Sequence, residues 1–65
     1  MSDSLLRLEQ VRARTGLSRS SVYAKVASGD FPKPVAIGSR AVAWVESEVS
    51  GWIQARIEGS RRVVA

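Results

Sequence analysis

The chain has 65 residues, with ten Lys and Arg against six Asp and Glu, which gives a formal net charge of +4. A chain of this length forms one domain with a small core. Because it contains neither Cys nor His, a disulfide framework is excluded and the usual zinc sites lack their ligands. Its apolar runs are short and its N-terminus has no signal core, so we expect a cytoplasmic protein without membrane contact.

The charge is unevenly distributed along the chain. Residues 7–40 hold seven cations against two acids, a balance of +5, whereas residues 41–58 hold one cation against three acids, a balance of −2. A basic front and a mildly acidic back suit a polyanion such as DNA on one face. An ordinary solvated surface with excess Lys and Arg explains the charge equally well, so charge alone does not decide.

The N-terminal part predicts a flexible leader at residues 1–4, an extended segment at residues 5–7 and a short helix from Leu8. Leu8, Val11 and, beyond the following turn, Leu17 fit one buried side. A helix of about two turns does not persist alone, so it must pack against the next helix.

A turn then leads into a short basic helix over about residues 19–28. Gly16 can take the left-handed conformation that ends the first helix, and the Ser18 hydroxyl can accept a bond from an amide two or three residues later. Val22 and Val26 recur four residues apart and face inward. Two helices joined by such a corner form a helix-turn-helix, which places the first turn of the second helix against base edges in a major groove.

The next segment predicts a connector and a β-hairpin. Two prolines fix residues 30–34 as extended, and Phe31 is expected to fold back onto the core. Residues 35–37 and 41–44 are rich in β-formers and are separated by residues 38–40, which form a tight turn. We expect the apolar residues of both strands to pack on the body, which leaves the turn to project as a wing.

The strongest amphipathic pattern predicts a third helix, which begins near residue 46 and ends at Gly59. Its apolar positions, spaced as one face of a helix, are Val49, Trp52, Ile53 and Ile57. Gly51 within the helix indicates that a backbone or a ring packs close there. Residues 60–65 are expected to form a flexible basic tail. Trp44 and Trp52 are assigned to the core rather than to stacking on bases, because both fall on apolar stripes.

Several exposed polar side chains are candidate DNA ligands. Arg19 is expected to read a base, since its planar fork can bond both acceptors of guanine, with a phosphate clamp as the alternative. Tyr23 either places its hydroxyl at a phosphate or is wholly structural. The other candidates are the small donors Ser20 and Ser21, the phosphate-attracting Arg12, Lys25 and Lys33, and Arg40 at the wing, which is expected to reach a minor groove.

Catalysis is not expected, and we expect no metal or cofactor. Without His or Cys an enzyme would depend on carboxylates, and Glu46 and Glu48 are explained by the dipole of the third helix. The chain has no phosphate-cradling glycine loop. A rival hypothesis is a small adaptor that docks an integrase or another protein through the third helix.

Five blocks of sequence occur together at a joint spacing: residues 7–8, 15–23, 31–35, 40–44, and 46–49 with 52–53. Over about residues 5–58 the chain resembles the AlpA family of small phage and prophage regulators. The resemblance implies an α+β, mostly α, winged helix-turn-helix with three helices and a β-hairpin wing, related to MerR-like and excisionase folds. Residues 5–59 would form this domain.

The resemblance also implies a function. It indicates a double-stranded DNA-binding protein that regulates integrase or excision genes, or that is itself the excision directionality factor. An integrase and further copies of the chain on DNA are the other partners it suggests. Ala24 stands where the family often has Arg, and Ala36 where it often has Lys, so we expect this chain to lack two phosphate contacts that are typical of the family.

Overall fold

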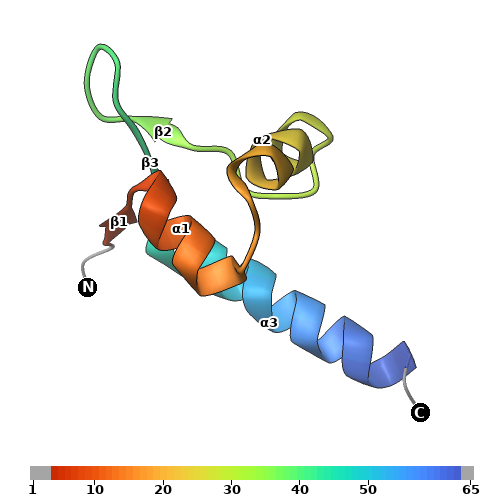
Figure 1. The fold of residues 1–65 in the computed structure, drawn as a ribbon. Helices are drawn as coiled ribbons and strands as arrows, with labels where there is room; N and C mark the ends of the chain where they lie inside the picture. Colours follow the sequence, from red (N-terminus) through yellow and green to blue (C-terminus); the bar gives the residue numbers. More distant parts are fainter. Residues whose placement is uncertain (1–3, 64–65) are drawn as a thin grey trace.

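The computed structural model describes residues 4–63, which form three helices and three short strands (Figure 1). In chain order they are β1 (Leu5–Leu6), α1 (Leu8–Thr15), α2 (Arg19–Ala27), β2 (Val35–Ala36), β3 (Val42–Val45) and α3 (Glu46–Val63). The predicted mostly helical α+β architecture with a small hairpin is confirmed. Residues 1–3 of the predicted leader and residues 64–65 of the predicted tail lie outside the described residues.

One small core holds these elements together. It draws a buried side chain from each helix, from two strands and from the connector: Leu6, Val11, Val22, Phe31, Trp44 and Val49. Trp44 is fully buried, and its indole Nε1 donates a hydrogen bond to the Pro32 carbonyl at 2.9 Å. The predicted core positions of Phe31 and Trp44 are therefore confirmed, while Trp52 packs against the core and is only partly buried.

Local signals form the corner between α1 and α2. Gly16 has φ 74°, a conformation that favours glycine, and its amide donates to the Arg12 carbonyl at 2.8 Å. The Thr15 hydroxyl donates to the Val11 carbonyl at 2.8 Å and accepts from the Leu17 amide at 3.2 Å. These bonds satisfy the end of α1, so the turn predicted from Gly16 is confirmed.

The other end of α2 is closed by a Schellman motif. Gly29 has φ 80° and donates its amide to the Val26 carbonyl at 3.1 Å, and the Asp30 amide donates to the Lys25 carbonyl at 2.7 Å. The second helix therefore ends where the glycine predicted it.

The three strands form an antiparallel sheet in the order β1-β3-β2, with Leu6 opposite Trp44 and Val35 opposite Ala43. Directly opposed residues share a face and successive residues alternate, so Val35 and Ile37 lie on the face away from Trp44. They are 40% and 45% exposed. The prediction that both strands of the hairpin pack their apolar residues on the body was therefore wrong for β2.

Helix α3 differs from its prediction in two ways. It continues through Gly59 to Val63, because Gly59 does not take the positive φ that ends α1 at Gly16. Beyond the adjoining residues and the backbone of its own helix, no heavy atom lies within 4 Å of a Cβ built at Gly51, so the expected close packing there was also wrong. In Figure 1 the C-terminal half of α3 extends away from the other elements. Within residues 4–63, no helix combines the length and apolarity needed to cross a membrane.

Candidate nucleic-acid interface

The first turn of α2 is fixed by its cap. The Ser18 hydroxyl oxygen accepts a hydrogen bond from the Ser21 amide at 3.1 Å, and the Ser18 O–H donates to the Ser21 hydroxyl oxygen at 3.0 Å. Of the two candidate serines, Ser21 is thus the one engaged in the cap. Ser20 is exposed, and its side chain has no hydrogen-bond partner among the described residues.

Tyr23 belongs partly to the core and partly to the surface. Its ring lies edge-on to Trp44, with 6.1 Å between the centroids and 62° between the planes. It is also 39% exposed, and its hydroxyl bonds to no described residue. The ring therefore fixes α2 on the core while leaving the hydroxyl open to solvent.

Three of the candidate cations are exposed and lack an ion pair in the described part of the chain. Arg19, Lys33 and Arg40 form no ion pair with any residue between 4 and 63. Arg19 opens α2, whereas Arg40 lies in the bend that joins the two strands of the hairpin. In Figure 1 both α2 and this hairpin bend lie on the side of the molecule away from the C-terminal half of α3. These three positive charges thus have no ion-pair partner within residues 4–63.

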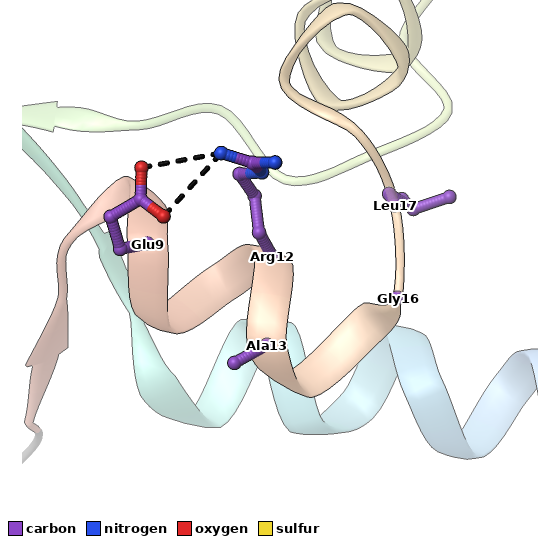
Figure 2. A pocket seen from close by; sticks show the side chains of 5 residues that line it. All are labelled: Glu9, Arg12, Ala13, Gly16 and Leu17. Carbon is purple, nitrogen blue, oxygen red and sulfur yellow. Dashed lines mark hydrogen bonds and ion pairs between the residues drawn. The ribbon is translucent and has the colours of Figure 1, made fainter.

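Arg12 is placed differently. Its Nη1 pairs with Glu9 Oε2 at 3.3 Å, and its Nε is buried without a partner in the described part of the chain. With Ala13, Gly16 and Leu17, this pair lines a shallow depression of about 360 Å³ beside the helix-turn-helix corner (Figure 2). Arg12 is therefore already partly neutralised, which weakens its attraction for a phosphate relative to that of Arg19.

Arg14, which follows Arg12 on α1, serves the fold. Its Nη2 pairs with Glu46 Oε2 at 2.8 Å and links the last turn of α1 to the first turn of α3. This pair also uses one of the acids that the sequence had assigned to the helix dipole. Arg14 is accordingly not part of the candidate interface.

Lys25 lies in the last turn of α2, and its Nζ is 4.0 Å from Asp30 Oδ2. The same carboxylate oxygen accepts a hydrogen bond from Arg56 Nη2 at 3.0 Å. The sequence-based reasoning gave Asp30 no role beyond the connector. One signal was available, because Asp30 is the single acid between residues 10 and 45.

Comparison with a family profile identifies the family of this chain. The profile described as prophage CP4-57 regulatory protein (AlpA) matches residues 4–57, from β1 through most of α3. The chain belongs to the AlpA family. The family is thus one of prophage regulatory proteins rather than of enzymes, and the resemblance inferred from the five sequence blocks is confirmed.

Two relatives of this AlpA-family chain show how far the similarity extends. It is 42% identical over 60 residues to the uncharacterized protein ORF88 of Enterobacteria phage P4, covering 92% of this chain and 68% of that protein. It is 31% identical over 58 residues to the DNA-binding transcriptional activator AlpA of Escherichia coli (strain K12), covering 80% of this chain and 83% of that protein. Both matches include most of each protein.

Proposed function

We propose that this AlpA-family protein binds double-stranded DNA at a specific sequence and regulates transcription of phage or prophage genes. The observation that carries the proposal is the first turn of α2. Its backbone is capped internally by Ser18, while the neighbouring Arg19 and Ser20 are exposed and find no partner among the described residues. A rigid helix start with free donors is what base recognition requires.

In this proposal α2 enters the major groove with its N-terminus toward the bases. Arg19 bonds the two acceptors of a guanine, and Ser20 is a second small donor beside it. Lys25 and Lys33 attract phosphates, which adds affinity without adding sequence preference. The positive end of the α2 dipole, at the same N-terminus, then also faces the negatively charged DNA.

The wing has a separate task. Arg40 stands in the bend at residues 38–40, exposed and without an ion pair among the described residues. A guanidinium in such a place can enter the adjacent minor groove, where a narrow A·T-rich track deepens the negative potential. It therefore favours a DNA shape over a base sequence.

Transcriptional control is the proposed output because the Escherichia coli relative is named a transcriptional activator. Excision directionality is the rival output, and it adds an integrase and further copies on DNA as partners. The exposed part of α3 also favours an adaptor function, since Ile57 is 37% exposed on it. These alternatives are compatible with DNA binding and differ in which protein partners the chain binds in addition to DNA.

The test begins with selection of bound duplexes from a random library, followed by affinity measurements on a selected and a random duplex. We expect Arg19→Ala to cost about 1 to 3 kcal/mol on the selected duplex and little on the random one. Lys33→Ala removes the same charge and is the matched control, which should weaken both duplexes alike. Equal losses from Arg19→Ala on both duplexes would make Arg19 a phosphate contact.

Salt dependence tests the basic surface as a whole. Each phosphate contact adds about 0.9 to the log–log slope of affinity against salt concentration. Wild type should therefore lose affinity steeply as salt rises. A flat response would contradict DNA binding through this surface.

The wing is tested with two duplexes that share the selected centre and carry either A·T or G·C flanks. Wild type should prefer the A·T flanks, and Arg40→Ala should lose that preference while keeping its fold. Lys33→Ala, again the matched control, should retain it. An undiminished preference in Arg40→Ala would assign Arg40 to the phosphates instead.

A further inference from the structure

Asp30 is an unexpected residue in a surface proposed to bind DNA. It is the single acid between residues 10 and 45, the part of the chain that contains the helix-turn-helix and the wing. It also follows the C-terminus of α2, the negative end of the helix dipole, where an acid is unfavourable. Its carboxylate therefore needs neighbouring cations.

Two cations meet this carboxylate at one oxygen. Arg56 Nη2 donates to Asp30 Oδ2 at 3.0 Å, whereas Lys25 Nζ lies 4.0 Å from the same atom. The first distance is that of a hydrogen-bonded ion pair, and the second is at the outer limit of one. Arg56 on α3 is thus the closer partner, and Lys25 on α2 is held loosely.

Helix α3 also holds the other parts of this junction. The guanidinium carbon of Arg56 lies 4.9 Å from the ring centroid of Trp52, and Trp52 Nε1 donates to the Asp30 carbonyl at 2.6 Å. The Trp52 and Phe31 rings pack edge-on, with 4.9 Å between their centroids. The backbone of the turn after α2 is therefore bound to α3 through the Asp30 carbonyl. Arg56 lies next to this turn, with its guanidinium over the Trp52 ring in a cation–π contact.

We propose that Arg56 is a positioning residue for DNA binding, which holds the Asp30 carboxylate on α3 and thereby leaves Lys25 free to meet a phosphate. The inference rests on the proposed function. With Arg56 present the three groups carry a net charge of +1. Without it the carboxylate has, among the described residues, Lys25 alone to pair with, and this pair at the C-terminal end of α2 carries no net charge.

The experiment measures affinity for the selected duplex at several salt concentrations with wild type, Arg56→Gln, Asp30→Asn and the double variant. Arg56→Gln should weaken binding about two- to fivefold, the range of an exposed ion pair, and lower the salt slope by about 1. In the Asp30→Asn background the same change should have no effect, because no carboxylate is left to capture Lys25. Arg56→Lys, which keeps the charge, should retain most of the affinity.

The effect of Lys25→Ala on DNA affinity distinguishes the proposed role of Arg56 from a merely structural one, because a structural role would not change that effect. Lys25→Ala should weaken binding in wild type and add no further loss to Arg56→Gln, since Lys25 is already paired there. Thermal melts of all variants separate loss of fold from loss of contact, and Asp30→Asn keeps the backbone carbonyl that Trp52 uses.

Three outcomes overturn the inference. If Arg56→Gln weakens binding equally with and without the Asp30 carboxylate, Arg56 contacts DNA directly. If Arg56→Gln leaves wild-type affinity and slope unchanged, the carboxylate does not compete for Lys25. If wild type itself fails to bind any duplex above background, the proposed function falls, and this inference falls with it.

Discussion

Replacing Ser18 by Ala, Asn and Asp in turn should separate the stability of α2 from its proposed contacts with DNA. The Ser18 hydroxyl makes two bonds in the first turn, as acceptor from the Ser21 amide at 3.1 Å and as donor to the Ser21 hydroxyl oxygen at 3.0 Å. Alanine removes both and leaves the Ser21 amide to solvent. The first turn of α2, which carries Arg19, then frays.

The size of the effect follows from the cap. Loss of an N-cap side chain costs about 0.5 to 2 kcal/mol, and the exposed setting of Ser18 puts the expected value near 1 kcal/mol. In a domain of this size, about 1 kcal/mol lowers the melting temperature by roughly 4 to 8 °C. DNA affinity should fall as well, because the donors of that turn are no longer held in one geometry.

Two further variants make the comparison decisive. Ser18→Asn restores a neutral cap and should recover both stability and DNA affinity. Ser18→Asp caps equally well and gains from the helix dipole, so its melting temperature should equal or exceed that of wild type. Its DNA affinity should nevertheless fall, because it places a carboxylate beside Arg19.

Thermal denaturation followed by circular dichroism gives the stabilities, and titration of the selected duplex gives the affinities. Ser20→Ala is the control for stability, since Ser20 makes no side-chain hydrogen bond to the described residues. An unchanged melting temperature in Ser18→Ala would refute the capping argument. Full DNA affinity in Ser18→Asp would refute the placement of this turn against DNA.

Other substitutions test the packing. Gly51→Ala should stabilise the protein by about 1 kcal/mol in chemical denaturation, because the new Cβ approaches nothing within 4 Å outside its own stretch of helix and the glycine has no positive φ; a loss of stability would show hidden crowding. Trp44→Ala should cost about 3 to 5 kcal/mol, a large part of the roughly 3 to 10 kcal/mol available to 65 residues, and its melting temperature in circular dichroism should fall steeply. Trp52→Ala should cost less in the same measurement, because Trp52 is only partly buried; the reverse order would refute the assignment of the core. Ile37→Thr should change the free energy of unfolding, measured by urea denaturation, by no more than about 0.5 kcal/mol. A larger loss would mean that the face of the sheet away from Trp44 is covered.

The sequence predicted the parts of this fold that neighbouring residues determine. Gly16, Ser18 and Gly29 act within a few residues of themselves, through a positive φ or a short hydrogen bond, so the helix-turn-helix and its ends were predictable. The burial of Phe31 and Trp44 was predictable as well, because a small core needs its largest apolar side chains.

Contacts between distant residues could not be predicted in the same way. The strand register, which pairs Val35 with Ala43, depends on how the whole hairpin sits on the body. The bond between Asp30 and Arg56 spans 26 positions and has no periodic signature. The candidate cations could be named from the sequence, but which of them are already paired within the protein could not.

The length of α3 determines which part of the protein unfolds first. Beyond Arg56 the described side chains of this helix, from Ile57 to Arg61, are exposed and form no ion pair or hydrogen bond within the described residues. A helical segment supported only by its own backbone bonds opens at little cost in free energy, whereas the amides near Val49 are released only when the core is lost. Hydrogen exchange should therefore be fast over the last turns of α3 and slow at its start. The far-ultraviolet signal should decline gently on warming before the cooperative transition begins, and this early loss of helix should leave the proposed DNA-binding surface intact.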